Sequence, residues 1–301
     1  MDPPQVTEII ECLPKGRTKF HYFRDRYALD LLRWFVGRGK TVAEVKRSRY
    51  ARLLAKPRVR ALCARLPDGR VTPEHLLNAW APRPLVFLLT LGRWGSRGHA
   101  WRTWYQVSRP GENLVLQLNF SGMHNRRYER LMRSTIEWWE GHPFLCTYHP
   151  VNDDGRLTLA WARLDVDLDG GEALVEEIQN DWIREAFACW RSIDERLLAR
   201  YRREVLAPYV RVWDEAMLAA TLWFLREELG VRRIFYHTFE SGNRLKHISG
   251  RRPPRSLYTK LPRRFCFEET ADMPRLLACT RHRRLRKELR RGTLRWFLLE
   301  L

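Results

Sequence analysis

The sequence contains little lysine, no closely paired cysteines and no long apolar run. Of its 55 cationic residues, eight are lysine and the other 47 are arginine. The longest apolar stretch, Leu85–Leu91, is far too short to cross a bilayer. No apolar segment follows a basic start, as it would in a secretory signal. We therefore expect a cytoplasmic protein with no membrane association.

The six cysteines stand apart, without a CxxC pair or a regular spacing. Disulfide frameworks and structural zinc sites usually show such spacings, so we expect reduced thiols and no bound metal. The segment from Asp165 to Glu176 does match the acidic spacing of an EF-hand calcium loop. Because its flanks are typical of strands, we favour a hairpin turn over calcium binding.

Positive charge is in clear excess: 55 Lys and Arg face 35 Asp and Glu, a net charge of +20. The 13 tryptophans and the 45% of hydrophobic residues exclude a charged disordered tail. The 301 residues suffice for one large domain or two smaller ones. Residues 251–295 hold 15 cationic and 4 acidic residues, so this segment carries +11 of the charge.

Residues 1–100 are predicted to form an α-helical region. Thr41 with Glu44 has the spacing of a capping box, and Thr72 precedes a proline at the first helical position. Together with the apolar pattern, these signals predict helices over residues 24–36, 41–54 and 72–80. Such short, arginine-rich helices fit a helix-turn-helix DNA reader or an all-α cap on a larger domain.

Residues 101–301 are predicted to form a second unit, in which the apolar period changes to two. Strands are predicted over residues 101–107, 113–120, 157–166, 173–179, 232–238, 263–268 and 293–300. Helices are predicted over residues 125–140, 182–206, 213–229, 241–248 and 281–291. Hairpins followed by strand–helix–strand units indicate an α+β fold, with a mixed, mainly antiparallel sheet flanked by helices.

This element order, and the segment from Asn243 through Tyr258-Thr259-Lys260 to Phe265, resemble the GNAT (N-acetyltransferase) superfamily. In that family antiparallel strands lead to a central strand, a helix, a parallel strand, a second helix and a closing hairpin. The resemblance implies acyl transfer to an amine. It also implies that Glu176 or Glu177 takes the amine proton, and that Tyr258 protonates the departing thiolate.

The resemblance further implies acetyl-CoA as a cofactor, but the usual pyrophosphate loop is absent. The family holds the pyrophosphate on a glycine-containing loop after the central strand. Here the corresponding residues, 179–184, contain no glycine, and the helix at Trp213 opens with two acids. We therefore expect an atypical or lost acyl-CoA site.

A second, local resemblance concerns Glu176–Trp182, which reads Glu-Glu-Ile-Gln-Asn-Asp-Trp. It is similar to a strand motif in large polyvalent proteins of phages and mobile elements. This resemblance implies a bacterial or phage setting, and it leaves a protein-interaction module as a further alternative.

The acidic strand defines the candidate site. A carboxylate buried in a sheet either carries a function or forms a structural pair with an arginine, and the sequence leaves both alternatives open. The catalytic candidates are Glu176, Glu177 and Tyr258. The candidate substrate pocket comprises Gln179, Asp181, Trp182, His237 and Asn243.

The basic helix over residues 281–291 is the candidate polyanion site. Its candidate contacts are Arg281, Arg283, Arg284, Arg286, Lys287, Arg290 and Arg291. A helix this basic is either solvated or faces a polyanion, such as nucleic acid or an acidic protein. The functional alternatives are thus a divergent GNAT-like acyltransferase, a nucleic-acid-associated binding protein and a protein-interaction module.

Overall fold

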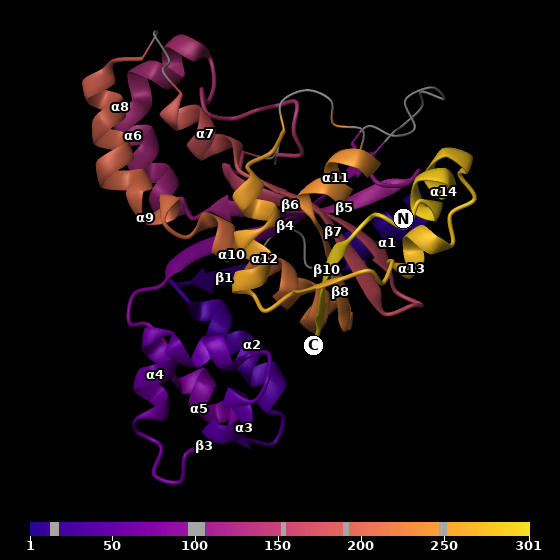
Figure 1. Ribbon diagram of the computed structural model, residues 1–301. Helices are drawn as coiled ribbons and strands as arrows, with labels where there is room; N and C mark the ends of the chain where they lie inside the picture. Colours follow the sequence, from indigo (N-terminus) through magenta and orange to yellow (C-terminus); the bar gives the residue numbers. More distant parts are fainter. Residues whose placement is uncertain (13–17, 96–105, 152–154, 189–192, 247, 249–251) are drawn as a thin grey trace.

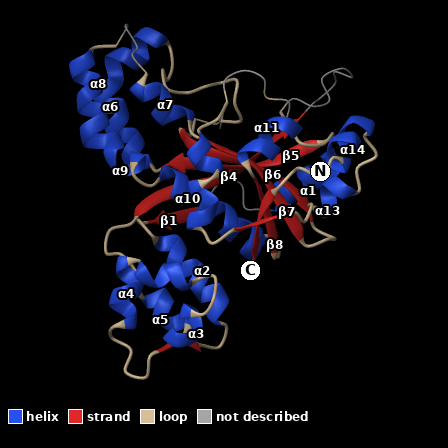
Figure 2. Cartoon of the chain, viewed as in Figure 1, coloured by secondary structure: helices blue, strands red, loops and turns tan. Residues whose placement is uncertain are grey.

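An eight-stranded mixed sheet forms the centre of the computed structural model (Figures 1 and 2). The structure describes all residues except 13–17, 96–105, 152–154, 189–192, 247 and 249–251. In spatial order the strands are β1 (Thr18–Tyr22), β4 (Leu85–Gly95), β5 (Glu112–Phe120), β6 (Thr158–Asp167), β7 (Glu172–Gln179), β8 (Arg233–His237), β10 (Trp296–Glu300) and β9 (Glu268–Thr270). The expected α+β class with a flanked, mixed sheet is confirmed.

Strands β7 and β8 are parallel, whereas the other pairings of this sheet are antiparallel. Their register runs only from Glu172 opposite Arg233 to Val175 opposite Tyr236. Beyond this point β7 continues, paired with β6 alone, and a bulge interrupts its register at Glu176. An extra residue of this kind bends a strand and re-aims its side chains. The two strands therefore separate where the acidic motif begins.

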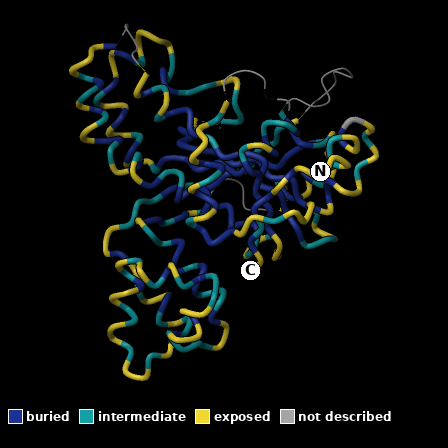
Figure 3. The backbone as a smooth tube through the Cα atoms, viewed as in Figure 1, coloured by how far each residue is buried: buried dark blue, intermediate teal, exposed yellow. Residues whose placement is uncertain are grey.

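The two faces of the sheet are covered by different helices. Helix α10 (Trp213–Trp223) packs against β5, β6 and β7 and continues into the wider turns of η3 (Phe224–Glu228). Its residues from Glu215 to Leu222 are all buried. The opposite face carries a smaller core, in which Leu174 and Phe235 meet residues of the C-terminal helices. The central strands β5, β6, β7 and β8 are buried along most of their length (Figure 3).

The chain between β7 and α10 forms a helical arm beside α6 (Gly122–Trp139), as Figure 1 shows. The arm contains α7 (Asp181–Phe187), α8 (Glu195–Tyr201), η2 (Arg202–Leu206) and α9 (Ala207–Val210). The continuous helix expected over residues 182–206 is therefore wrong. Helix α7 ends at Phe187, and residues 189–192 lie outside the described part.

The N-terminal helical unit lies below the sheet in Figure 1. In the sequence it comes between β1 and β4. It comprises α2 (Arg26–Val36), α3 (Val42–Lys46), η1 (Ala51–Ala55), α4 (Pro57–Cys63), α5 (Pro73–Asn78) and the small pair β2 (Lys40–Thr41) and β3 (Arg70–Val71). The predicted caps are confirmed: Thr41 accepts a hydrogen bond from the Glu44 amide, and Thr72 accepts one from the His75 amide. The helix expected over 41–54 is broken between α3 and η1.

The first hundred residues are not all helical, because they supply β1 and β4 to the central sheet. Strand β4 takes the place beside β5 that the sequence assigns to a strand over 101–107. Residues 101–105 of that prediction lie outside the described residues. The chain opens with α1 (Pro3–Cys12), which packs on β4 and β5. The sheet therefore unites the two predicted units.

The C-terminal segment supplies short helices around β10. They are α11 (Phe239–Leu245), η4 (Arg255–Tyr258), α12 (Lys260–Arg264), α13 (Arg275–Ala278) and α14 (Arg283–Arg290). The strand expected over 263–268 is wrong, since α12 occupies its start and β9 begins only at Glu268. The hairpin of β6 and β7, helix α14 and strand β10 match their predicted places. No described helix is long and apolar enough to cross a membrane.

Candidate functional site

A buried cluster of charged and polar side chains fills the space where β7 and β8 separate. Glu176 has no exposed surface. Its carboxylate accepts hydrogen bonds from the Ser108 amide (3.1 Å) and hydroxyl (2.7 Å), and it contacts Nε2 of His237 at 3.2 Å. Nδ1 of His237 lies 3.0 Å from Oγ of Ser241. A carboxylate with three polar partners is well satisfied without water.

Glu177 forms the second half of this cluster. It is ion-paired with Arg163 on β6 and lies 3.6 Å from Nζ of Lys246. Lys246 follows α11 and also donates to the Glu176 carbonyl at 2.8 Å and to the Tyr258 hydroxyl oxygen at 3.5 Å. One ammonium therefore joins both glutamates and the tyrosine.

The pKa shifts follow from this arrangement. Burial alone raises the pKa of Glu176, but the hydrogen bonds of His237 and Ser108 and the charge of Lys246 outweigh it and leave that pKa well below its usual value. Burial also opposes ionisation of Glu177, and Lys246 with Arg163 reverses the effect, so its pKa is lowered. Burial lowers the pKa of His237. Burial also lowers the pKa of Lys246, and the charge of Glu177 opposes this shift. The cluster thus places both carboxylates against Lys246 and Arg163, while burial favours the neutral imidazole of His237.

The cluster is closed to solvent within the described residues. Glu176, Glu177, His237, Lys246 and Tyr258 are each at most 4% exposed. Burial raises the pKa of Tyr258 far above its usual value, so its hydroxyl stays protonated. A substrate would have to displace an existing ion pair to reach either carboxylate. This arrangement resembles a structural network more than an open acid–base site.

A serine in this cluster does not have the contacts of an activated nucleophile. Oγ of Ser108 lies 2.8 Å from Nε2 of His237. In a catalytic triad, however, the other ring nitrogen faces a carboxylate. Here Nδ1 of His237 faces Ser241, and Glu176 contacts the same nitrogen as Ser108.

The predicted pocket is divided between separate places. Glu176, Glu177, Tyr258 and His237 meet in the cluster just described. Gln179 and Asp181 lie together at the end of β7, where Nε2 of Gln179 donates to Oδ1 of Asp181 at 2.7 Å. The remaining two candidates, Trp182 and Asn243, make other contacts: the Trp182 ring donates to the Tyr201 hydroxyl, and the Asn243 amide donates to the Phe239 carbonyl.

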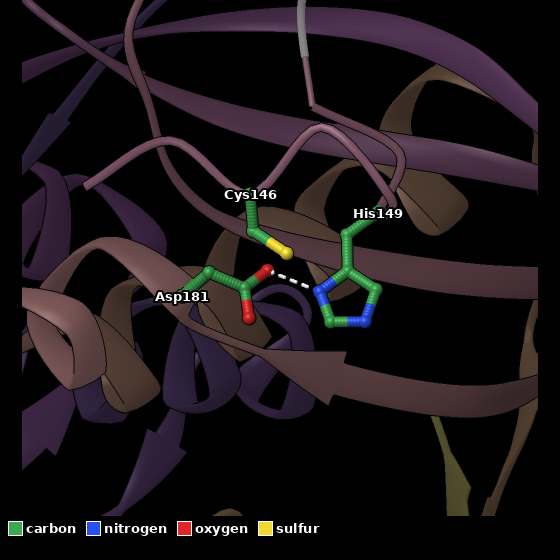
Figure 4. Close-up of side chains that lie close together, drawn as sticks. All are labelled: Cys146, His149 and Asp181. Carbon is green, nitrogen blue, oxygen red and sulfur yellow. Dashed lines mark hydrogen bonds and ion pairs between the residues drawn. The ribbon is translucent and has the colours of Figure 1, made fainter. Parts of the chain in front are cut away.

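Asp181 belongs to a second polar network, which the sequence analysis missed. Oδ2 accepts a hydrogen bond from Nδ1 of His149 (2.7 Å) and one from the Trp161 ring (3.2 Å), while Oδ1 accepts from Arg184 (2.7 Å). Among the described residues, the group suited to hold a metal is Asp181 with His149 and Cys146 (Figure 4). The local signal was the spacing Cys-x-x-His, but Asp181 is distant in the sequence.

The EF-hand pattern does not form a calcium loop. The carboxylate of Asp165 is buried in β6 and paired with Arg109, and Glu176 is enclosed in the sheet. The residues between β6 and β7 form the expected hairpin turn.

The basic helix α14 forms the third candidate site. Leu285 is buried in the smaller core and Leu289 packs against it, so this helix is not basic on every side. Glu288 accepts hydrogen bonds from Arg244 (2.7 Å) and Arg291 (2.6 Å). A hollow of about 340 Å³ is lined by four residues, all cationic: Arg283, Arg286, Lys287 and Arg290. The side chain of Arg284 lies outside the described part of the structure. Arg281 and Arg291 are exposed near the two ends of the helix.

Comparison with known proteins assigns no relative to this fold. No protein-family model matches the chain, and neither a curated protein nor a solved structure shows significant similarity to it.

Proposed function

We propose that this protein binds nucleic acid through the α14 surface, defined as Arg281, Arg283, Arg286, Lys287, Arg290 and Arg291, and that a divergent GNAT-like sheet serves as its scaffold. The order of elements supports the GNAT-like part of the proposal. Antiparallel strands lead to β7, helices lead to the parallel strand β8, and α11 precedes the antiparallel pair of β9 and β10.

The observation that carries the proposal is the hollow on α14, whose lining contains four cations and no carboxylate. Guanidinium groups bind phosphate oxygens in a bidentate geometry, and clustered cations at close range raise the local concentration of a polyanion. Leu285 and Leu289 fix the opposite side of the helix to the core, so the cationic side faces outward. An eight-residue helix is about 12 Å long, which matches roughly three or four phosphates along one strand.

The test is a titration of fluorescein-labelled 20-nucleotide RNA and DNA, followed by anisotropy between 50 and 200 mM NaCl. We expect the affinity to fall as salt rises, with a slope of about −3 to −4 on logarithmic axes for duplex DNA. In the triple variant Arg286→Ala, Lys287→Ala, Arg290→Ala, the affinity should drop at least about 10-fold. The salt dependence should become shallower, with a slope closer to zero by roughly two to three units.

A matched control removes the same charges elsewhere. Lys46, Arg60 and Arg65 are exposed residues of the N-terminal helical unit, and their replacement by alanine also deletes one lysine and two arginines. This control should bind like wild type. If instead it loses affinity while the α14 variant retains it, the N-terminal helices are the nucleic-acid site. If neither RNA nor DNA binds at 50 mM NaCl, the proposal is wrong.

Acyl transfer is the second candidate function, because β7 and β8 diverge at the two glutamates, with Tyr258 nearby. Two observations weigh against it. A backbone amide at the start of α7 already has an acceptor, because the Asn180 side chain accepts a hydrogen bond from the Ile183 amide. The first turn also contains the Asp181 carboxylate, at the place where a pyrophosphate would need positive charge. A thermal shift with 1 mM acetyl-CoA tests it: a rise in Tm would support acyl transfer, and we expect none.

A further inference from the structure

Three side chains with metal-binding atoms converge beside the end of β7. Cys146 and His149 lie on the loop between α6 and β6, and Asp181 is the first residue of α7. The thiol sulfur, a ring nitrogen and a carboxylate oxygen all lie within 4.8 Å of one another. Figure 4 shows the sulfur and Nδ1 of His149 turned toward the carboxylate. This spacing is compatible with three ligands around one ion, given metal–ligand distances of about 2.0–2.3 Å.

The loop is folded so that Cys146 and His149 point to the same side. The His149 amide donates to the Cys146 carbonyl at 3.1 Å, which closes a tight turn. The turn therefore brings the Cys146 sulfur and the His149 ring to the same place, within 4.8 Å of each other and of the Asp181 carboxylate.

The carboxylate is held in place by residues around it. Gln179 and Arg184 both donate to Oδ1 of Asp181 at 2.7 Å, which leaves Oδ2 directed at His149. The Asp181 side chain is 3% exposed, whereas that of His149 is 25% exposed. Outer partners of this kind orient a metal ligand and tune its affinity. Cys146 and His149 are both partly exposed, so two of the three side chains border the solvent.

We propose that Cys146, His149 and Asp181 bind a divalent transition-metal ion of the zinc class. One thiolate and one imidazole favour zinc or cobalt over magnesium or calcium, which prefer oxygen ligands alone. Three protein ligands leave a fourth, open position for water.

The charges and protons of the binding step balance. The thiolate and the carboxylate offset the two positive charges of the ion, and the Arg184 guanidinium stays on the outer oxygen. The ion takes the place of the proton between Nδ1 of His149 and Oδ2 of Asp181. In neutral His149 the ring proton moves to Nε2, and the thiol proton of Cys146 is released to solvent. Because the thiol gives up its proton when the ion binds, metal affinity should increase with pH.

Cobalt chloride is the first probe, because a Co²⁺–thiolate bond gives a charge-transfer band in the near ultraviolet. We expect wild type to develop this band with one equivalent of Co²⁺ and to lose it when Zn²⁺ is added. Cys146→Ser should abolish the band, whereas the control Cys279→Ser, at an exposed cysteine, should retain it. Gln179→Ala should weaken Co²⁺ binding about 10- to 100-fold, as the loss of an outer partner does elsewhere.

A second measurement uses the unaltered protein, so that it does not depend on the folding of a variant. Iodoacetamide labelling with mass spectrometry compares Cys146 with the exposed Cys12 and Cys279, with and without ZnCl₂. Selective protection of Cys146 by Zn²⁺ is expected. Equal labelling of Cys146 with and without the ion, or a Co²⁺ band that survives Cys146→Ser, overturns the proposal. Neither result bears on nucleic-acid binding, since α14 contributes nothing to this site.

Discussion

Replacing Lys246 by methionine tests whether the buried cluster holds β7 and β8 in place. The ammonium lies 3.6 Å from the Glu177 carboxylate, and at an effective dielectric constant of about 20 this pair attracts by roughly 4–5 kcal/mol. Methionine retains most of the side-chain volume and removes the charge. The variant then encloses two carboxylates with Arg163 as the remaining cation.

We expect the free energy of unfolding to fall by about 3 kcal/mol. Breaking a buried ion pair costs about 3–5 kcal/mol, and the lower end applies because Arg163 still faces Glu177. The assay is urea denaturation at pH 7, followed by circular dichroism. Lys46→Met, at an exposed position of α3, provides the control and should change stability by less than about 0.5 kcal/mol.

The double variant Lys246→Met, Glu177→Gln isolates the interaction itself. If the loss in the single variant reflects an uncompensated carboxylate, removing that charge should restore at least about 1 kcal/mol. A single-variant loss below about 1 kcal/mol, or strictly additive effects in the double variant, would refute this account of the cluster.

Three further predictions concern other parts of the chain. Burial lowers the pKa of His124 to about 4, so the unfolded chain binds a proton at this histidine before the folded chain does as the pH falls below about 6.5. His124 alone should contribute a loss of about 3 kcal/mol of stability between pH 6.5 and 4, and His124→Phe should reduce the decline by that amount in a denaturation series, while the share of the buried His237 remains. Leu285→Ala should loosen α14, cost about 2–4 kcal/mol locally and speed hydrogen exchange in residues 283–290, whereas exchange in α10 should not change. Glu215 joins α10 to the end of β1 and the start of α2, because its carboxylate accepts from the Tyr22 hydroxyl and the Asp25 amide, both at 2.6 Å. Glu215→Ala should cost about 2–3 kcal/mol by urea denaturation and Glu215→Gln clearly less, because the amide oxygen still accepts.

Much of the local structure could be predicted from the sequence, because short-range signals determine it. Thr41 and Thr72 cap their helices through contacts three residues away, and the turn between β6 and β7 follows from its Asp and Gly residues. Strand β4 could not be assigned in this way. Its apolar run from Leu85 is identified as a strand by its pairing with β5, whereas the sequence pattern places the partner of β5 nearer, over residues 101–107.

The candidate site shows the same division. The acidic pair of β7 is visible in the sequence, and the structure buries both carboxylates. Their partners are not visible, because Ser108, Arg163 and Lys246 come from three distant segments that only the sheet brings together. Cys146 and Asp181 meet for a similar reason: the hairpin of β6 and β7 returns the chain to the loop after α6.

Glu176→Gln separates a structural role of the acidic strand from a catalytic one. Glu176 accepts from the amide and the hydroxyl of Ser108, so the neutral amide of glutamine removes the charge from the acceptor of both hydrogen bonds. A structural role predicts a loss of about 2–3 kcal/mol at pH 7, since hydrogen bonds to a charged group contribute about twice as much as neutral ones. A catalytic base held ready for a substrate predicts unchanged or increased stability, because functional groups are commonly strained in the free protein.

The pH dependence gives an independent readout of the same variant. The pKa of Glu176 is lowered in the folded state, so its contribution is present above the unfolded pKa of about 4.3 and is lost as the pH falls further. Wild type should therefore lose stability more steeply than Glu176→Gln below about pH 4.5, whereas Glu8→Gln, on the exposed side of α1, should follow the wild-type curve. Parallel curves for wild type and Glu176→Gln would show that this carboxylate does not hold the strands together.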